Sequence, residues 1–273
     1  MRDSERISYT GMKVNDLINI IETIAPREMA CDWDNTGFQV GRRDAEVTGI
    51  YVALDATEKV ISAAIDAGCS FLLTHHPLIF KGVKSISDDS SVGRRLLMMA
   101  ENGIAYYAAH TSYDAAPGMM ADRIASRLGL NDTVPIEPSQ NGGAIGRVGR
   151  LASPMLPSEL SRMVKNALSI PYVTEYASEE SAEKRLTYIG VLPGSGRDEL
   201  ALAQQLGAEA YVTGDISYHS AVDAMEDGMV VIDAGHYGTE WAFIDDMKEE
   251  LKKLLPCDIP VIGADFHFPG NIR

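Results

Sequence analysis

Short apolar runs that end in polar residues recur along the chain and predict buried strands that alternate with amphipathic helices. The clearest run begins at Phe71 and ends in two adjacent imidazoles, His75 and His76, followed by Pro77. The other predicted strands span residues 50–54, 104–109, 147–151, 172–176, 186–192, 210–215 and 229–233. Helical spacing of apolar residues occurs in segments 13–25, 60–65, 92–101, 119–128, 158–168, 198–206, 218–226 and 243–254. This alternation is typical of an α/β fold with parallel strands.

A stretch rich in Pro, Asn, Gln and Gly, residues 129–143, interrupts the alternation and indicates a boundary. The length of 273 residues and the hydrophobic content of 45% are sufficient for two cores. We therefore expect two α/β domains. The first spans residues 1–130 and is completed by 230–273, and the second spans 131–229.

Cysteine spacing, apolar runs and net charge exclude several classes of protein. Cys31, Cys69 and Cys257 lie far apart without C-x-x-C spacing, which indicates neither a disulfide framework nor a thiolate zinc site and favours a reducing compartment. Residues 1–9 contain no signal-peptide core, and no apolar run approaches the length of a membrane span, so we expect a cytoplasmic protein with no membrane partner. The formal net charge of -15 argues against binding of nucleic acid through its phosphates.

Two predicted loops are candidate ligand-binding sites. Residues 32–37 superficially resemble a calcium loop, but Arg43 stands at the twelfth position, where a bidentate glutamate is required. We expect a turn there with Trp33 packed inward. Residues 193–196, Pro-Gly-Ser-Gly, form a glycine turn between a predicted strand and a predicted helix, which can bind an anion through backbone N–H groups. The signal is weak because the P-loop lysine is missing, and a plain tight turn is the alternative.

The strongest chemical signal is the pair His75 and His76 at the end of its strand. Adjacent side chains on an extended chain point apart, so each imidazole can serve one ion of a pair, or an irregular backbone before Pro77 can bring them together. Alternatively, one is a hydrogen-bonded core residue and the other is solvated. Ligands bind beyond the carboxyl ends of parallel strands, and His110 and Asp114 follow another such strand.

A second group of candidate ligands lies near the C-terminus. His236 and Glu240 are four residues apart, so they share a face if a helix begins at or just after His236. The candidates thus include nitrogen and carboxylate ligands without thiolate, a set that suits zinc, manganese, iron, cobalt or nickel better than calcium. His110 and His219 are candidates for proton transfer, with a packed or capping role as the alternative for each.

Several segments also carry a resemblance to a known family. They are Val-Ala-Leu-Asp-Ala-Thr at 52–57, Leu-Thr-His-His-Pro-Leu-Ile-Phe at 73–80, Ala-His-Thr-Ser-Tyr-Asp at 109–114, Thr-Gly-Asp at 213–215 and Gly-His-Tyr-Gly-Thr-Glu at 235–240. In this order they closely resemble the motifs of the Nif-three-like dinuclear metal-centre proteins, often labelled GTP cyclohydrolase I type 2 homologues. The resemblance runs from Trp33 to the final helix. It implies two similar α/β domains with mixed, mostly parallel sheets, and a ring-shaped homo-hexamer.

The resemblance further implies a site for two divalent metal ions. His75 and Asp114 would hold one ion, His76 and His236 would hold the other, and Glu240 would bridge both. Two ions a few ångström apart lower the pKa of a water molecule between them and polarise the bond that it attacks. We therefore expect a metal-dependent hydrolase that uses a metal-bound water on a small molecule, which the family label suggests is a purine nucleotide such as GTP. The alternative is a non-catalytic metal-binding, scaffold or regulatory protein.

Overall fold

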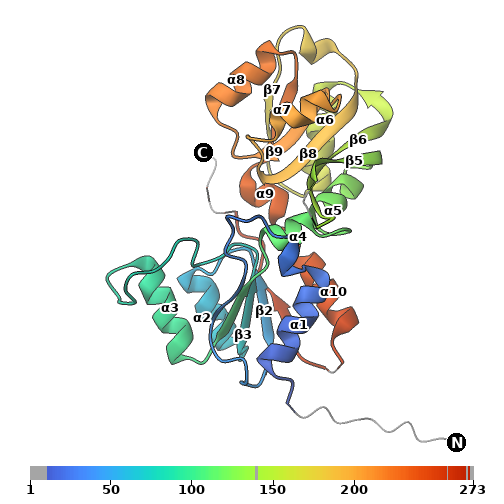
Figure 1. Cartoon of the computed structure of the whole chain (residues 1–273). Helices are drawn as coiled ribbons and strands as arrows, with labels where there is room; N and C mark the ends of the chain where they lie inside the picture. The colour runs from blue at the N-terminus through green and yellow to red at the C-terminus, as the bar shows by residue number, and fades with distance from the viewer. Residues whose placement is uncertain (1–10, 139–140, 257, 269, 271–273) are drawn as a thin grey trace, which may run out of the picture. The chain divides into compact units, whose positions relative to one another are not determined.

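The chain divides into two compact units in a computed structural model (Figure 1). Residues 11–138, 141–256, 258–268 and 270 are described, so the N-terminal segment 1–9 and Cys257 lie outside the described residues. The first unit is made of residues 1–27, 33–110 and 244–265, and the second unit is made of 28–32, 111–243 and 266–273.

The chain passes between the units after residues 27, 32, 110, 243 and 265. Helix α5 (Met120–Arg127) belongs to the second unit, because its apolar side chains pack into the core of that unit. Periodicity predicts that a helix is amphipathic, but it does not say which sheet the apolar face will cover.

The first unit is an α/β/α sandwich. In spatial order its described strands are β1 (Gly37–Val40), β4 (Ala105–Ala108), β3 (Phe71–Thr74), β2 (Ile50–Ala53) and β11 (Val261–Gly263). β1 runs antiparallel to β4, and the other neighbours are parallel. The carboxyl ends of β2, β3 and β4 therefore lie along one edge of the sheet, where the residues that follow each strand can meet.

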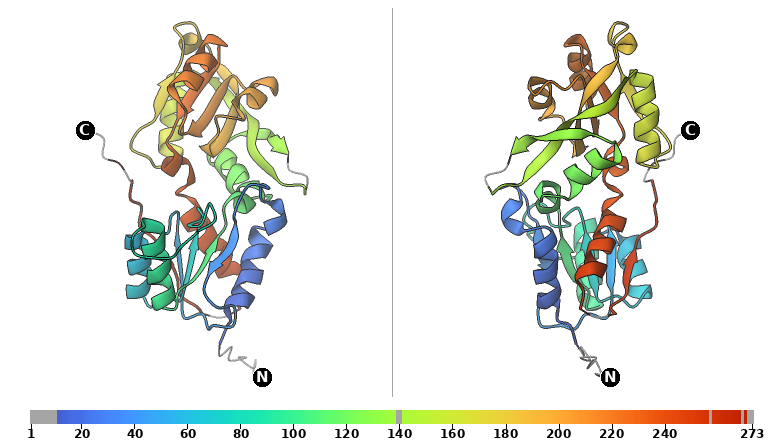
Figure 2. Two further views of the ribbon diagram at one scale, coloured as in Figure 1. Left: turned by 60° about the vertical axis from the view of Figure 1, so that its left-hand side comes forward. Right: turned by 90° about the vertical axis from the view of Figure 1, so that its right-hand side faces the viewer.

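Helices cover both faces of this sheet. α2 (Glu58–Asp66) and α3 (Ser91–Glu101) lie on one face, and α1 (Val14–Ile24) and α10 (Phe243–Leu254) lie on the other (Figure 2). α1 follows the predicted helical spacing and buries Val14, Leu17, Ile18, Ile21 and Ile24. Its N-cap is Lys13, whose backbone N–H donates a hydrogen bond to the Asp16 carboxylate at 3.3 Å.

The second unit is also a layered α/β structure. In spatial order its described strands are β5 (Asn131–Pro138), β6 (Ala144–Met155), β8 (Leu186–Ser195), β9 (Ala210–Gly214), β10 (Val230–Asp233) and β7 (Thr174–Tyr176). The central pairs β8–β9 and β9–β10 are parallel, whereas the outer pairs are antiparallel. The expectation of mixed sheets is confirmed, and the parallel strands again form the centre.

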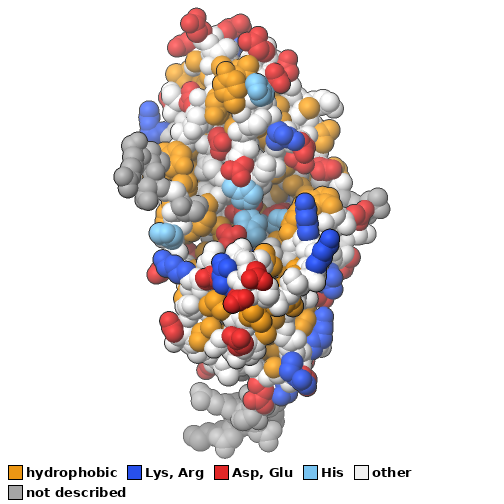
Figure 3. Space-filling model, turned by 90° about the vertical axis from the view of Figure 1, so that its left-hand side faces the viewer, with side chains coloured by type: hydrophobic (Ala, Val, Ile, Leu, Met, Phe, Trp, Pro, Cys, Tyr) orange, Lys and Arg blue, Asp and Glu red, His pale blue; other side chains and the backbone are white. Residues whose placement is uncertain are grey.

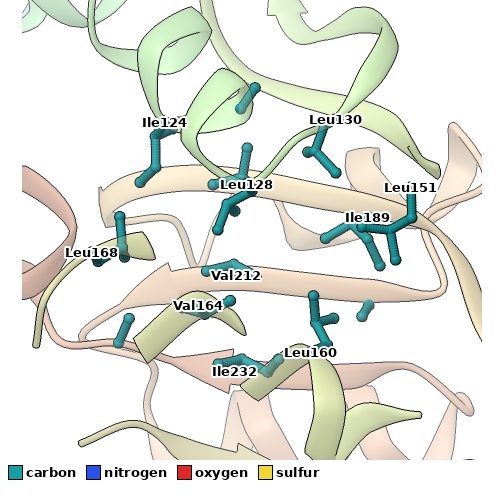
Figure 4. Packing of buried hydrophobic residues seen from close by; sticks show 14 of the residues in the cluster. Ile124, Leu128, Leu130, Leu151, Leu160, Val164, Leu168, Ile189, Val212 and Ile232 are labelled. Atoms are coloured by element: carbon teal, nitrogen blue, oxygen red, sulfur yellow. The ribbon is translucent and has the colours of Figure 1, made fainter. Parts of the chain in front are cut away.

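Two further helices pack on each face of the second sheet. α5 and α6 (Pro157–Ala167) share one hydrophobic cluster with the central strands. Figure 4 labels ten residues of this cluster: Ile124, Leu128, Leu130, Leu151, Leu160, Val164, Leu168, Ile189, Val212 and Ile232. α7 (Leu200–Gln205) and α8 (Tyr218–Glu226) contribute to the cluster on the opposite face. The short helices α4 (Thr111–Ala115) and α9 (His236–Glu240) and the single-turn segments η1 (Arg27–Met29) and η2 (Ser181–Glu183) complete the described elements.

Within segment 129–143, whose composition indicated a boundary, residues Asn131–Pro138 form strand β5. β5 lies at the edge of the sheet and contains Pro135 and Pro138. An edge strand needs N–H donors on one side only, so it tolerates prolines that a central strand would exclude.

On the face drawn in Figure 3, acidic, basic and hydrophobic side chains are interspersed. Within the described part of the chain, no helix combines the length and the apolar character needed to cross a bilayer.

Candidate metal centre

His75 and His76 follow strand β3 and have converging rings. Their ring centroids are 4.9 Å apart, with an angle of 54° between the ring planes. The carbonyl of His76 accepts hydrogen bonds from the Thr74 hydroxyl at 2.7 Å and from the Tyr106 hydroxyl at 2.9 Å. Burial raises the pKa of Tyr106, so this phenol keeps the proton that it donates. These bonds fix the irregular backbone after the strand, and of the two alternatives for adjacent histidines the converging one is observed.

Each imidazole in the first unit is held through Nδ1 by a different acceptor. His75 Nδ1 lies 3.0 Å from the carbonyl oxygen of Ala109. His76 Nδ1 lies 3.0 Å from Oδ1 of Asp55, the residue that follows β2 by two positions. Carbonyl and carboxylate oxygens only accept, so Nδ1 carries the proton and a neutral ring has its lone pair at Nε2. Metal-binding histidines are held in this way by outer partners.

His110, which follows strand β4, is the third imidazole of this group. Its Nδ1 lies 2.9 Å from Oδ1 of Asp34, whose side chain is 0% exposed. Its backbone N–H donates to the Thr36 hydroxyl at 3.3 Å, and that hydroxyl donates to the Ala108 carbonyl at 2.8 Å. The segment before β1 is therefore built around His110.

The expectation that Trp33 packs inward is wrong. Its side chain is 62% exposed, and its ring meets the edge of the His110 ring at a centroid distance of 5.9 Å. The chain instead turns the neighbouring Asp34 inward, where the hydrogen bond to His110 compensates for burying a carboxylate. A short turn can bury only one of two adjacent side chains, and this hydrogen bond decides which.

The imidazoles of the first unit gather at the edge where the parallel strands end. One ring nitrogen from each of His75, His76 and His110 lies within 4.8 Å of the others. Since β2, β3 and β4 are parallel neighbours, the residues after them were expected to meet there. The structure brings His110 into this group together with the two predicted ligands.

In the second unit, α9 places His236 and Glu240 on one face as expected from their spacing. His236 Nε2 lies 3.2 Å from Glu240 Oε2, and the Glu240 side chain is only 4% exposed. On the other side of the ring, His236 Nδ1 lies 3.0 Å from Oδ2 of Asp215, the residue that follows β9. Asp215 has a positive φ of 50°, an uncommon conformation for a residue other than glycine.

The glycine turn at residues 193–196 extends strand β8 to Ser195, and its N–H groups are used within the unit. Gly194 N–H donates to the Thr239 hydroxyl at 2.9 Å, and Gly196 N–H donates to the Thr213 hydroxyl at 3.0 Å. A Cβ atom at Gly194, where φ is +73°, would collide with the Glu240 carboxylate. The glycine thus allows β8 to approach Glu240, and these contacts do not support an anion site here.

Asp233, the last residue of β10, supports the backbone around His236. Its carboxylate accepts hydrogen bonds from the Gly235 N–H at 2.8 Å and from the Ile216 N–H at 3.2 Å. Burial raises the pKa of Asp233, and the nearby Asp215 carboxylate acts in the same direction, whereas the two N–H bonds oppose them. Asp233 therefore connects the loops that follow β9 and β10.

The remaining predicted residues lie outside these groups. Asp114 is on α4 of the second unit and is partly buried. His219 is exposed at the start of α8, with its ring 5.3 Å from that of Tyr218. A role of His110 or His219 in proton transfer stays a prediction.

Sequence reasoning missed the outer partners Asp34, Asp55 and Asp215. A signal was available for two of them, because Asp55 follows the predicted strand 50–54, Asp215 ends the predicted strand 210–215, and each lies 21 residues before a candidate ligand. Asp34 carries no such signal, since it belongs to the segment before β1.

The donor set fits a divalent transition metal. Because His236 Nδ1 donates to Asp215, a neutral ring turns its Nε2 lone pair toward the Glu240 carboxylate. Two acceptors 3.2 Å apart require a positive charge between them, either a proton on Nε2 or a metal cation. Imidazole and carboxylate without thiolate suit zinc and its neighbours among the divalent metals.

The chain is similar to known proteins of one family. A family model described as Duf34/NIF3 (NGG1p interacting factor 3) matches residues 12–267. A Clostridium perfringens protein named GTP cyclohydrolase 1 type 2 homolog is 36% identical over 253 residues, covering 92% of this chain and 95% of that protein.

Solved structures show the same fold. A hypothetical protein of Staphylococcus aureus superposes with a TM-score of 0.85 and 28% identity, covering 97% of this chain and 100% of that one. A Bacillus cereus protein related to NIF3 has a TM-score of 0.87 at 22% identity, covering 97% and 99% of the two chains, and this likeness concerns the fold alone. With a family model that matches nearly its whole length, the chain belongs to the Duf34/NIF3 family.

Proposed function

We propose that this protein binds two divalent metal ions and is a metal-dependent hydrolase that acts on a purine nucleotide. The supporting observation is the anchoring of His75, His76 and His236 through Nδ1, which leaves Nε2 as the metal-binding nitrogen in each neutral ring. The ions would be zinc, manganese, iron, cobalt or nickel.

The ligand assignment follows family membership. His75 and Asp114 would hold one ion, His76 and His236 would hold the other, and Glu240 would bridge both. Burial of Glu240 beside His236 supports this role, since a buried carboxylate needs a positive partner.

The protein's own residues have distinct tasks in this proposal. Bound divalent ions would supply a lowered pKa for water and polarisation of the bond to be cleaved. Asp55 and Asp215 hold the rings of His76 and His236 in the tautomer that binds metal. Gly194 gives Glu240 the space to keep its position.

The substrate class rests on the names of relatives. Proteins from Clostridium perfringens and Methanocaldococcus jannaschii, 36% and 32% identical to this chain, are both named GTP cyclohydrolase 1 type 2 homolog. A purine nucleotide whose ring is opened by water is therefore the substrate that we propose.

One observation favours a second candidate, a non-catalytic metal-binding, scaffold or regulatory protein. The Gly194 and Gly196 N–H groups, which sequence analysis offered as an anion cradle, donate to Thr239 and Thr213. Phosphate recognition therefore has no support at this turn, and a nucleotide would need other contacts.

The metal-binding part is tested by elemental analysis after dialysis. We expect two ions per chain in the unaltered protein and reduced occupancy of both sites in Glu240→Ala. The matched control is Glu249→Ala, an exposed glutamate on α10. Full two-ion occupancy in folded Glu240→Ala protein would contradict the bridging role.

Catalysis is tested separately by screening purine nucleotides for turnover with metal-replete and metal-free protein. Turnover only in the metal-replete sample supports the hydrolase. Turnover in folded, metal-free protein would contradict metal dependence, and failure of every nucleotide in metal-replete protein would favour the binding role.

We also propose that the chain assembles as a ring-shaped homo-hexamer in the cytoplasm, an inference from family resemblance and from cysteine usage. Cys69, one of the dispersed cysteines, is buried, and burial raises the pKa of its thiol, as expected for an unreactive core residue. Light scattering that gives the mass of a single 29.6 kDa chain at micromolar concentration would contradict the hexamer.

A further inference from the structure

We propose that Trp33 and Phe80 form the surface on which a purine base stacks beside the candidate metal centre. The inference rests on the proposed function, because it assigns the contacts that hold the base of the proposed nucleotide. Neither residue binds metal in that proposal. Both residues belong to the first unit, so the stacking surface lies within one compact part of the chain.

Both aromatic side chains are exposed although they are large and apolar. Trp33 is 62% exposed and Phe80 is 48% exposed, and their ring centroids are 5.9 Å apart. Single exposed apolar residues are common on proteins, but two large rings in contact form a local apolar surface. Covering such a surface with a ligand removes apolar area from water, which favours binding roughly in proportion to that area. The pair is therefore suited to bind a planar, largely apolar group.

Hydrogen bonds fix the backbone that carries the two rings. Phe80 lies in the loop between β3 and α3. The preceding residue, Ile79, donates its N–H to Gln39 Oε1 at 2.9 Å, and its carbonyl oxygen accepts a hydrogen bond from the Asn35 side-chain amide. Asn35 lies two residues after Trp33, so these bonds join the segment that carries Trp33 to the loop that carries Phe80. The rings are held in place before a ligand binds, which lowers the entropy cost of binding.

His110 connects the aromatic pair to the candidate metal centre. Its ring centroid lies 5.9 Å from that of Trp33 and 6.4 Å from that of Phe80. The same ring lies 5.3 Å from that of His75 and 5.6 Å from that of His76. The proposed reaction opens a bond within the purine ring, so the base rather than the phosphates has to lie beside the ions. A base stacked on the pair would be one ring away from these two ligands.

The inclination of the rings favours a flat heteroaromatic ligand. Trp33, Phe80 and His110 meet pairwise at angles of 52–74°, so they present ring edges as well as ring faces. Aromatic groups associate by offset stacking and by edge-to-face contact. Nucleobases stack on aromatic side chains, and the two fused rings of a purine cover more of an indole than the single ring of a pyrimidine does.

The loop that carries Phe80 also supplies positive charge. Lys81 and Lys84 follow Phe80 and are exposed, and the sequence has no acidic residue between Pro77 and Asp88. In a chain with a formal net charge of -15, this local excess of positive charge is suited to the phosphates of a nucleotide. Stacking would hold the base while the lysines attract the phosphates.

The test measures binding of GMP, AMP, CMP and ribose 5-phosphate to the full chain by calorimetry. Metal-free protein is used, so that neither turnover nor metal contacts contribute. We expect GMP and AMP to bind more tightly than CMP, and ribose 5-phosphate, which lacks a base, to bind least. Trp33→Ala and Phe80→Ala should each weaken GMP binding by about 5- to 150-fold, the range for loss of one base–aromatic stack. Trp33→Phe, which retains a ring, should keep most of the affinity.

Tryptophan fluorescence gives a second readout. The chain has two tryptophans, and the other, Trp241, belongs to the second unit and donates its indole N–H to the Leu168 carbonyl at 2.8 Å. GMP stacked on Trp33 should quench its emission, and Trp33→Phe should abolish the quenching while most of the binding remains. The matched control is Tyr218→Ala, which removes a 71% exposed aromatic ring on α8 and should change neither affinity nor quenching. Circular dichroism confirms that each variant is folded.

The inference is overturned if GMP does not bind the folded unaltered protein, if ribose 5-phosphate binds as tightly as GMP, or if Trp33→Ala and Phe80→Ala both leave GMP binding unchanged. Failure of the proposed function looks different: metal-replete protein would then turn over no purine nucleotide, while GMP binding would still depend on Trp33. Conversely, turnover with a KM that Trp33→Ala does not change would support the hydrolase and refute the stacking surface.

Discussion

The same strand–helix–strand frame occurs once in each unit, at residues 50–76 and 210–236. In the first copy, Asp55 follows β2 and orients His76 after β3; in the second, Asp215 follows β9 and orients His236 after β10. Both pairs are separated by 21 residues and both Nδ1–carboxylate distances are 3.0 Å. An aspartate after one strand thus fixes a histidine after the neighbouring parallel strand in both units.

The helices between these strands are also equivalent. α2 and α8 each have 9 residues. Their N-caps, Thr57 and Ser217, each accept a hydrogen bond from the backbone N–H three residues on, at 3.2 Å. The frame repeats at an interval of 160 residues, taken from the difference between Asp215 and Asp55, and the same interval separates His236 from His76. A repeated unit at a fixed interval indicates that the second ligand frame has the same architecture as the first.

The copies differ after the second strand. His75 N–H donates to the Ala53 carbonyl, and Ala234 N–H donates to the Thr213 carbonyl, so Ala234 occupies the position of His75. The second copy then inserts Gly235, with φ of 72°, and enters α9 at once. In the first copy Pro77 follows the histidines, and a residue before proline disfavours helix.

Because of this difference, the same strand–helix–strand frame presents different candidate metal ligands in the two units. Where Pro77 follows the histidines and no helix begins, the residue beside the oriented histidine adds a second imidazole, His75. Where a left-handed glycine starts a helix, the residue one turn later, Glu240, adds a carboxylate instead. The shared aspartate is the constant part, and the added ligand is the variable part.

The largest effect that tests the comparison is removal of either oriented histidine. His76→Ala and His236→Ala should each weaken metal binding by more than about 100-fold, the upper end of what loss of an outer partner costs. Stability of the metal-free protein should change little, because both residues lie beyond strand ends. Competition with a chelator measures the affinity, and denaturant unfolding of metal-free protein measures the stability. A loss confined to one of the two variants would break the equivalence.

The second-largest expected effect on metal binding comes from replacing Asp55 or Asp215. Asp55→Asn and Asp215→Asn should each weaken metal binding by about 10–100-fold, because the amide no longer holds the Nδ1–H tautomer through a charge. Imidazole nitrogen chemical shifts in metal-free protein report the tautomer directly, and each variant should gain Nε2–H form at its own histidine only. Asp66→Asn on α2 and Asp223→Asn on α8 are exposed controls. Unchanged tautomers in both variants would refute the positioning role.

Sequence predicted the parts of this frame that local pattern determines. Apolar runs located β2, β3, β9 and β10, and helical spacing located α2 and α8. Local pattern alone could not show the pairing of Asp55 with His76, because it depends on which strands are neighbours in the sheet. It could still have been found by aligning Asp55-Ala56-Thr57 with Asp215-Ile216-Ser217, as the repeat is visible in the residues.

Two other structural features, strand β5 and the exposure of Trp33, depended on contacts between segments far apart in the sequence. The prolines of β5 lie in a segment whose composition indicated a boundary, and an edge strand tolerates them. Trp33 was expected inside on hydrophobicity alone, and the hydrogen bond between Asp34 and His110 reversed the turn. The preference of a residue type predicts its conformation or burial only on average, whereas the strand conformation of β5 and the exposure of Trp33 each depended on a partner far away in the sequence.

A smaller effect concerns the caps that begin the two equivalent helices. Thr57→Ala and Ser217→Ala should each lower the free energy of unfolding by about 1 kcal/mol, since each removes the acceptor for one N–H in the first turn. Metal affinity should be unaffected. Denaturant unfolding measures the change, and a difference of more than about 1 kcal/mol between the variants would show that the two frames are not energetically matched.

The smallest effect distinguishes the residues that end the second strand in each copy. Thr74 in the first copy is neutral, whereas Asp233 in the second is a partly buried carboxyl whose pKa is raised, mainly because it is removed from water. A group whose pKa is higher in the folded than in the unfolded state contributes stability below its unfolded pKa and loses that contribution as pH rises through its folded pKa. The contribution of Asp233 to stability should therefore grow as pH falls from 7 toward the ordinary carboxyl pKa of about 4.

The variant Asp233→Thr, which places at this position the residue found in the first unit, should remove this pH dependence. Denaturant unfolding of metal-free protein at several pH values measures it, with Asp223→Thr as the exposed control. If the stability difference between unaltered protein and Asp233→Thr instead shrinks on acidification, the carboxylate is stabilised by its two N–H bonds more than burial disfavours it, and both copies then rely on a hydrogen-bonded support of the same sign.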